Sequence, residues 1–185
     1  MSCEAEKSEN EIKYQSSGTL LKMAMDEYTK ERDRANALDN KASFFMTVIV
    51  GVATIFIPII PFSNLLVFFE TVGPCFLKCF VSIFLVGILI AFIVLSAAFR
   101  KFYDAYKLTD YMRPSLLCIV DSNNHTAQSD QLERGLSDHY KTVVDNNVNV
   151  NNRKCQSISD GVKFCGIGFI VLVTTAIGLI VIIGG

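Results

Sequence analysis

The stretch of residues 19–51 constrains the fold most, because it contains no proline and no glycine before Gly51, and its character changes from charged to apolar along its length. Charged and polar residues dominate up to Lys41, and an apolar run follows from Ala42. Most of these residues are good helix formers, so the stretch predicts one continuous helix. A helix over residues 19–60 would be about 60 Å long, of which about 30 Å suits the hydrocarbon core of a bilayer. We therefore predict a helix that joins a water-soluble stalk to a membrane span.

Two later segments share this apolar character. Hydrophobic residues make up 51% of the chain, and the mean hydropathy is +0.38. Residues 42–60, 79–99 and 164–185 each lack Asp, Glu, Lys and Arg and are long enough to cross a bilayer. Pro58 and Pro61 are predicted to end the first span. The predicted fold is an all-α integral membrane protein in which three transmembrane helices continue into a cytosolic helical bundle, assembled as a symmetric homo-oligomer.

Lysine and arginine are distributed unevenly around the three spans. They precede the first span, follow the second and precede the third, whereas residues 62–76 contain none. By the positive-inside rule, the N-terminus is cytoplasmic and the C-terminus external. The predicted division of the chain is a flexible N-terminus (1–18), a cytosolic stalk helix (19–41), the first span (42–61), an external loop (62–78), the second span (79–99), a cytosolic helical region (100–163) and the third span (164–185).

The cytosolic region is expected to be mostly helical. The second span is followed by a sequence with no helix breaker before Pro114, which predicts that its helix continues to that point. Asp130, with Glu133 three residues later, predicts the start of another helix. Three helical arms of this kind would pack into one bundle.

Candidate ligand-binding groups are the cations and asparagines of these arms. Arginine suits phosphate oxygens and asparagine suits base edges, so a nucleotide or oligonucleotide could bind if the arms converge. Two alternatives stay open: the cations could set topology or contact anionic lipid, and the asparagines could face water or fix helix register. The candidates are Arg32, Arg34, Lys41, Arg100, Lys107, Asn149, Asn152, Arg153 and Lys154.

The spans carry small and hydroxyl residues on two helix faces. Such residues either allow close helix packing or line a narrow pore once subunits associate. They are Thr47, Gly51 and Thr54 in the first span and Gly168, Thr175 and Gly178 in the third. No nucleotide-binding, hydrolase or metal-binding motif is present, so we expect no enzyme activity, no metal and no cofactor.

The layout of the chain resembles a known group of proteins. The segment from Arg32 to Phe45, with Asp39, Lys41 and Ala42 in a D-x-K-A pattern, is followed by a second span, a cytosolic helical insertion and Asn152-Arg153-Lys154 before the last span. This arrangement resembles the Pycsar transmembrane effector family and is similar to the small multi-span effectors of bacterial anti-phage defence (CBASS, SLATT-type and Hailong-type).

The resemblance implies a protein of the bacterial inner membrane that is controlled by a partner nucleotidyltransferase or cyclase. The partner would make a nucleotide second messenger or a short single-stranded nucleic acid, and the effector would depolarise the membrane to arrest the infected cell. Whether the ligand opens or closes the pore is left open. The alternative function is a non-conducting membrane anchor that recruits a soluble defence partner.

Overall fold

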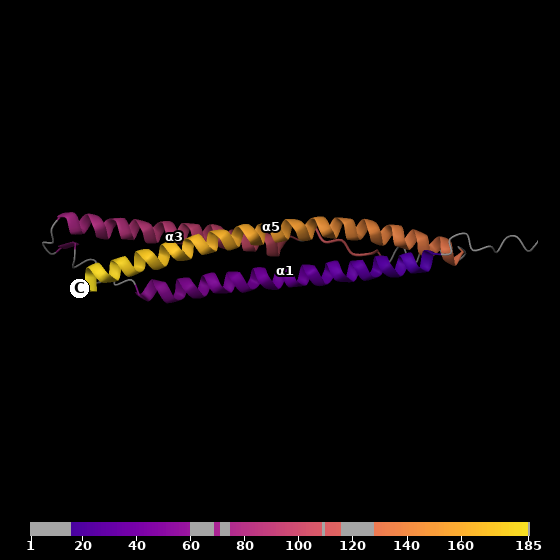
Figure 1. The fold of residues 1–185 in the computed structure, drawn as a ribbon, viewed down its shortest axis with the longest axis horizontal. Helices are drawn as coiled ribbons and strands as arrows, with labels where there is room; N and C mark the ends of the chain where they lie inside the picture. The colour runs from indigo at the N-terminus through magenta and orange to yellow at the C-terminus, as the bar shows by residue number, and fades with distance from the viewer. Residues whose placement is uncertain (1–15, 60–68, 71–74, 109, 116–127, 185) are drawn as a thin grey trace, which may run out of the picture. The chain divides into compact units, whose positions relative to one another are not determined.

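Three long helices make up the fold in the part of the chain that the structure describes. The computed structural model describes residues 16–59, 69–70, 75–108, 110–115 and 128–184. The helices are α1 (Ser17–Ile59), α3 (Cys75–Lys107) and α5 (Ser129–Gly184) (Figure 1). Each is long and apolar enough to cross a membrane. The predicted all-helical class with three helices of membrane-spanning length is therefore confirmed, and the cytosolic bundle and the symmetric homo-oligomer stay predictions.

Helix α1 is continuous from the charged stalk through the apolar run, as predicted. It begins at Ser17, and the main-chain N–H of Leu20 donates to the Ser16 carbonyl over 3.0 Å. It ends at Ile59, one residue after Pro58, which fits the expected role of proline near a helix terminus. Most of the predicted N-terminal segment (1–18) and external loop (62–78) lies outside the described residues.

Helix α3 is shorter at its C-terminal end than predicted. The sequence contains no breaker before Pro114, yet the helix ends at Lys107, and residues 110–115 are not helical. The prediction was wrong because it considered only local propensity. Asparagine side chains of α5 bind the main-chain groups of this segment, as described below, and so stabilise a non-helical path.

Helix α5 runs unbroken through residues 146–152, five of which are asparagine. It begins at Ser129, one residue before the predicted cap at Asp130. Glu133 does not complete the predicted capping box: its carboxylate accepts hydrogen bonds from the hydroxyls of Ser129 (3.3 Å) and Ser17 (2.7 Å). The contact with Ser17 attaches the first turn of α1 to the first turn of α5.

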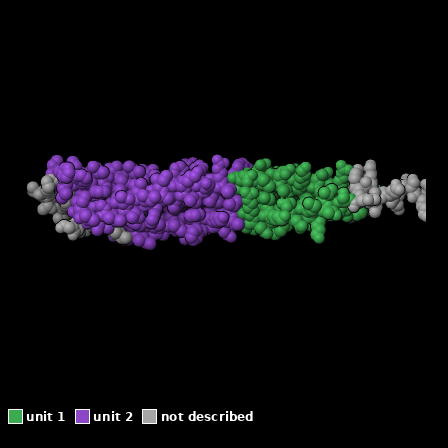
Figure 2. Space-filling model, in the orientation of Figure 1, with its two compact units in different colours: residues 1–36, 109–152 green, residues 37–108, 153–185 purple. Residues whose placement is uncertain are grey.

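The chain divides into two compact units (Figure 2). We call residues 1–36 and 109–152 the polar unit, and residues 37–108 and 153–185 the apolar unit. Helices α1 and α5 contribute residues to both.

The apolar unit is packed through small residues and rings. Ala42, Ala91 and Ala98 are fully buried, and the rings of Phe45 and Phe102 stack with centroids 5.0 Å apart. Many large apolar side chains on the outside are exposed, including those of Val86, Ile90, Ile170 and Val181. An exposed apolar exterior around a core of small residues is what a helix bundle needs in lipid.

Candidate functional site

The asparagines of α5 in the polar unit bind main-chain groups of the chain itself. The Asn147 carboxamide accepts from the Met112 N–H over 2.9 Å and donates to the Met112 carbonyl over 3.0 Å. Asn146 donates to the Asp110 carbonyl over 3.0 Å. Asn147 is fully buried, so these bonds take the place of the hydrogen bonds that its amide would make to water. The carboxamide thus pairs with residue 112 as a peptide group would, and it holds the segment after α3 in place.

One helical turn further on, Asn151 connects α5 to α1. Its Nδ2 donates to the main-chain carbonyl of Glu31 over 2.9 Å and to the Glu31 carboxylate over 2.7 Å. Asn151 is fully buried. Among the described residues, its Oδ1 has no hydrogen-bond donor. The two asparagines therefore fix register within the polar unit, one of the alternatives that the sequence left open.

A tyrosine lies beside this network. The hydroxyl of Tyr111 is buried and has no partner of good geometry in the described part of the chain, although Asn147 is close enough to influence it. Burial raises the pKa of Tyr111 to about 12, with smaller contributions from Tyr28 and Glu31, while Arg32 and Asn147 oppose the shift. The phenol is therefore neutral at physiological pH.

Four of the nine predicted ligand-binding residues lie in the polar unit. Arg34 donates to Asn152 Oδ1 over 2.9 Å and lies 3.5 Å from the Glu31 carboxylate. Asn149 is exposed one turn before Asn152 on α5, and Arg32 is exposed on α1. The structure thus brings Arg34 and Asn152 into contact at the surface. We call Arg34, Asn149 and Asn152 the polar-unit surface.

The other five predicted residues lie in the apolar unit. Lys41, Arg100, Lys107 and Arg153 are exposed, whereas Lys154 is only 4% exposed. The Lys154 ammonium lies 2.7 Å from Asp39 Oδ1 in a largely buried ion pair. A lysine already bound to a carboxylate inside the chain is a poor phosphate ligand. We therefore leave Lys154 out of the proposed binding surface.

The small residues of α5 are packed against α3. A Cβ added at Gly168 would lie 2.9 Å from Leu95 Cγ and 3.3 Å from the Leu95 main-chain nitrogen. At Gly178 an added Cβ would collide with the ring of Phe84, and at Gly87 with the methyl group of Thr175. For Gly168, Thr175 and Gly178, the structure favours close helix packing over pore lining.

The small residues of α1 have no such neighbours. A Cβ added at Gly51 would meet nothing within 4 Å, and Thr47 and Thr54 are exposed. Both hydroxyls donate to the carbonyl four residues earlier, Ser43 (3.0 Å) and Val50 (2.8 Å), so they need no further partner in lipid. This face of α1 is open to contact with another helix.

The predicted site residues did not include Asn147, Asn151 or Asp39, although helix register was one of the roles left open for the asparagines. The signal was nevertheless present, since Asn147, Asn151 and Lys154 fill the gaps between Val143, Val150 and Ile158 at helical spacings of three and four residues. Polar residues within a buried helical stripe need partners inside the protein, which predicts an internal hydrogen-bond network.

Together, the three helices of membrane-spanning length and their exposed apolar side chains support the class of helical membrane proteins. No family model, no curated protein and no solved structure matches this chain. The function is therefore inferred from the chain's own residues.

Proposed function

We propose that this protein is a membrane effector of bacterial anti-phage defence, whose homo-oligomer conducts ions under the control of a nucleotide or short single-stranded nucleic acid. The ligand would come from a partner nucleotidyltransferase or cyclase and would bind the polar unit on the cytoplasmic side of the inner membrane. Conduction would depolarise the membrane and arrest the infected cell.

One observation carries the proposal: α1 and α5 both supply the polar-unit surface and both continue without a break into apolar segments that can cross a membrane. Arg34 is 41% exposed and can offer its remaining guanidinium donors to phosphate oxygens. Asn152 is in contact with Arg34, and Asn149 is exposed one turn earlier on α5. A ligand that prefers one arrangement of α1 and α5 would shift the equilibrium between two states of the oligomer.

The exposed face of α1 supports the conducting part of the proposal. Three helices of one copy cannot readily enclose a water-filled path, so a pore needs several copies. Gly51 leaves room for a close approach between helices, and the hydroxyls of Thr47 and Thr54 lie on the same face.

The first experiment is to purify the full chain from cells that also express its neighbouring genes and to identify bound nucleic acid by absorbance ratio and mass spectrometry. The protein is then placed in liposomes loaded with a potassium-sensitive dye, and flux is measured with cyclic nucleotides and with short single-stranded DNA. We expect one of these probes to change flux. If the pure protein never conducts with any of them, the anchor function replaces the channel.

Two variants separate binding from conduction. Arg34→Gln should raise the half-effective probe concentration about tenfold, because one charged hydrogen bond to phosphate is lost. Lys22→Gln removes another exposed cation from α1, outside the polar-unit surface, and should change nothing. Thr47→Leu should alter conductance while the probe still binds. Unchanged flux and unchanged probe response in both Arg34→Gln and Thr47→Leu would contradict the proposal.

A further inference from the structure

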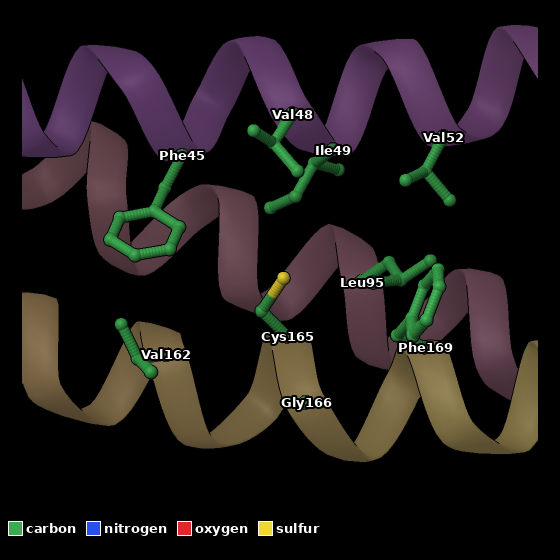
Figure 3. Close-up of a pocket in the computed structure, with 9 residues that line it drawn as sticks. All are labelled: Phe45, Val48, Ile49, Val52, Leu95, Val162, Cys165, Gly166 and Phe169. Atoms are coloured by element: carbon green, nitrogen blue, oxygen red, sulfur yellow. The ribbon is translucent and has the colours of Figure 1, made fainter.

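An apolar groove opens on the apolar unit between α1 and α5, with α3 behind it. Its volume is about 330 Å³. Figure 3 shows the Cys165 sulfur pointing across the groove toward α1. The lining contains no charged side chain and consists of Phe45, Val48, Ile49, Val52, Leu95, Val162, Cys165, Gly166 and Phe169.

The groove begins where both walls change from polar to apolar sequence. Phe45 follows the last charged residue of α1 by one helical turn, and Val162 adjoins the last charged residue of α5. These charged residues are Lys41 and Lys163, and both are exposed. In a membrane this level corresponds to the boundary between headgroups and acyl chains, where lysine side chains reach toward phosphate.

The nearby charges leave these lysines available. Lys163 lies 3.7 Å from Asp160, but the Lys163 side chain is 72% exposed and that of Asp160 is 38% exposed, so water weakens the attraction. Asp39 is engaged by the buried ammonium of Lys154. Arg100 of α3 is also exposed and adds positive charge. The end of the groove therefore carries an excess of cations.

We propose that the groove is a binding site for an anionic phospholipid, with one acyl chain between α1 and α5 and the headgroup phosphate on Lys41 and Lys163. The apolar lining suits a hydrocarbon chain, and the cations suit the phosphate. A whole helix of a second copy, about 10 Å across, does not fit inside a groove of about 330 Å³. A free nucleotide would leave its polar groups unpaired against the apolar walls. The site goes beyond the proposed function, because lipid would bind here whether or not the protein conducts.

Gly166 allows the groove to be filled without disturbing the fold. A Cβ added there would meet nothing within 4 Å, so the side chain introduced by Gly166→Leu can extend into the groove. Gly51 is the matched control, because a Cβ added there is equally free of contacts and Gly51 does not line the groove.

The absence of tryptophan from the sequence provides a clean optical probe. Phe169→Trp places a fluorophore in the groove. Ile170→Trp places one on the neighbouring surface, because Ile170 is 66% exposed and does not line the groove. Val48→Trp is a second groove probe on the other wall. Each full-length variant is reconstituted in phosphatidylcholine vesicles containing a minor fraction of phosphatidylglycerol. Bromine is carried on the acyl chains of one lipid or the other.

The two brominated lipids are compared when each makes up the same mole fraction of the vesicle. Brominated phosphatidylglycerol should then quench both groove probes as though it were enriched about fivefold per engaged lysine. The Ile170→Trp probe should respond equally to the two lipids. Gly166→Leu should abolish the groove quenching, and Gly51→Leu should leave it intact. Replacing Lys41 and Lys163 by Gln should remove the preference for the anionic lipid but keep the quenching. Equal quenching by both lipids in both groove probes, or no quenching by either, would overturn the proposal.

Discussion

The Asn151 amide of α5 donates to both the main-chain carbonyl and the carboxylate of Glu31 on α1. One buried side chain thus holds two helices at a single register within the polar unit. Because the Asn151 amide is fully buried, its loss removes both hydrogen bonds at a place where water does not readily replace them.

We therefore expect Asn151→Ala to lower the free energy of unfolding by about 1–3 kcal/mol, the cost of an unsatisfied buried polar group. Asn149→Ala is the matched control, because Asn149 is exposed on the same helix and its loss should change stability by about 0.5 kcal/mol at most. Thermal unfolding of the full chain in detergent, followed by circular dichroism, measures both. Equal melting temperatures for the two variants would contradict a register role for Asn151.

The ion pair between Lys154 and Asp39 predicts strongly non-additive substitutions. Lys154→Met leaves Asp39 without its cation, and Asp39→Leu leaves a nearly buried ammonium unpaired. Breaking such a pair typically costs about 3–5 kcal/mol, whereas replacing both charges with apolar groups can be close to neutral. The double variant should therefore melt above at least one single variant in the same unfolding assay. Additive losses would show that the two residues act independently.

Close packing of α5 on α3 predicts that two glycines, each within an apolar run, differ in how well they tolerate substitution by alanine. Gly168→Ala should destabilise the protein by about 1–3 kcal/mol, because the new methyl group meets both the side chain and the main chain of Leu95. Gly51→Ala meets nothing and should be neutral or slightly stabilising. Unfolding curves in one detergent compare them directly. Equal effects of the two substitutions would mean that α3 and α5 do not pack as described.

The raised pKa of Tyr111 predicts a loss of stability at alkaline pH. The folded state keeps the phenolic proton up to about pH 12, whereas the unfolded chain releases it near pH 10.0. The contribution of Tyr111 to the free energy of unfolding is therefore fully present below pH 10 and is lost as the pH rises from 10 to 12. Tyr111→Phe removes the ionisable group, so its unfolding free energy should fall less between pH 9 and 12 than that of the wild type.

At pH 8 the two proteins should differ little, because the hydroxyl has no partner of good geometry among the described residues. Parallel pH profiles would show that the environment of Tyr111 does not resist ionisation. The comparison with Phe also cancels the titration of the remaining tyrosines, which both proteins share.

The course of α1 could be predicted well, but the partners of the buried asparagines could not. Continuous helix formers from Thr19 and the apolar run from Ala42 predicted α1, because local propensity and hydropathy act along the chain. The non-helical residues 110 and 112 bind Asn146 and Asn147, which lie far along the sequence. A pattern within one segment contains no information about such a partner.

The predicted site residues separate into exposed and buried groups for the same reason. Sequence identifies Arg34 and Lys154 equally as cations, and only the fold distinguishes an exposed guanidinium bonded to Asn152 from an ammonium enclosed beside Asp39. Gly168 and Gly51 likewise could not be distinguished from the sequence, although Gly168 packs against Leu95 and Gly51 has open surroundings. Burial separates them, and burial is a property of the assembled helices.

The attachment of Met112 to Asn147 uses only main-chain atoms of residue 112, and the Met112 side chain is exposed. The bond therefore places almost no demand on which amino acid occupies that position, with proline the exception because it lacks the N–H. Evolution could exchange the side chain at position 112 freely while a single asparagine on α5 preserved the path of the chain. We expect homologues to vary at position 112 and to retain asparagine at position 147.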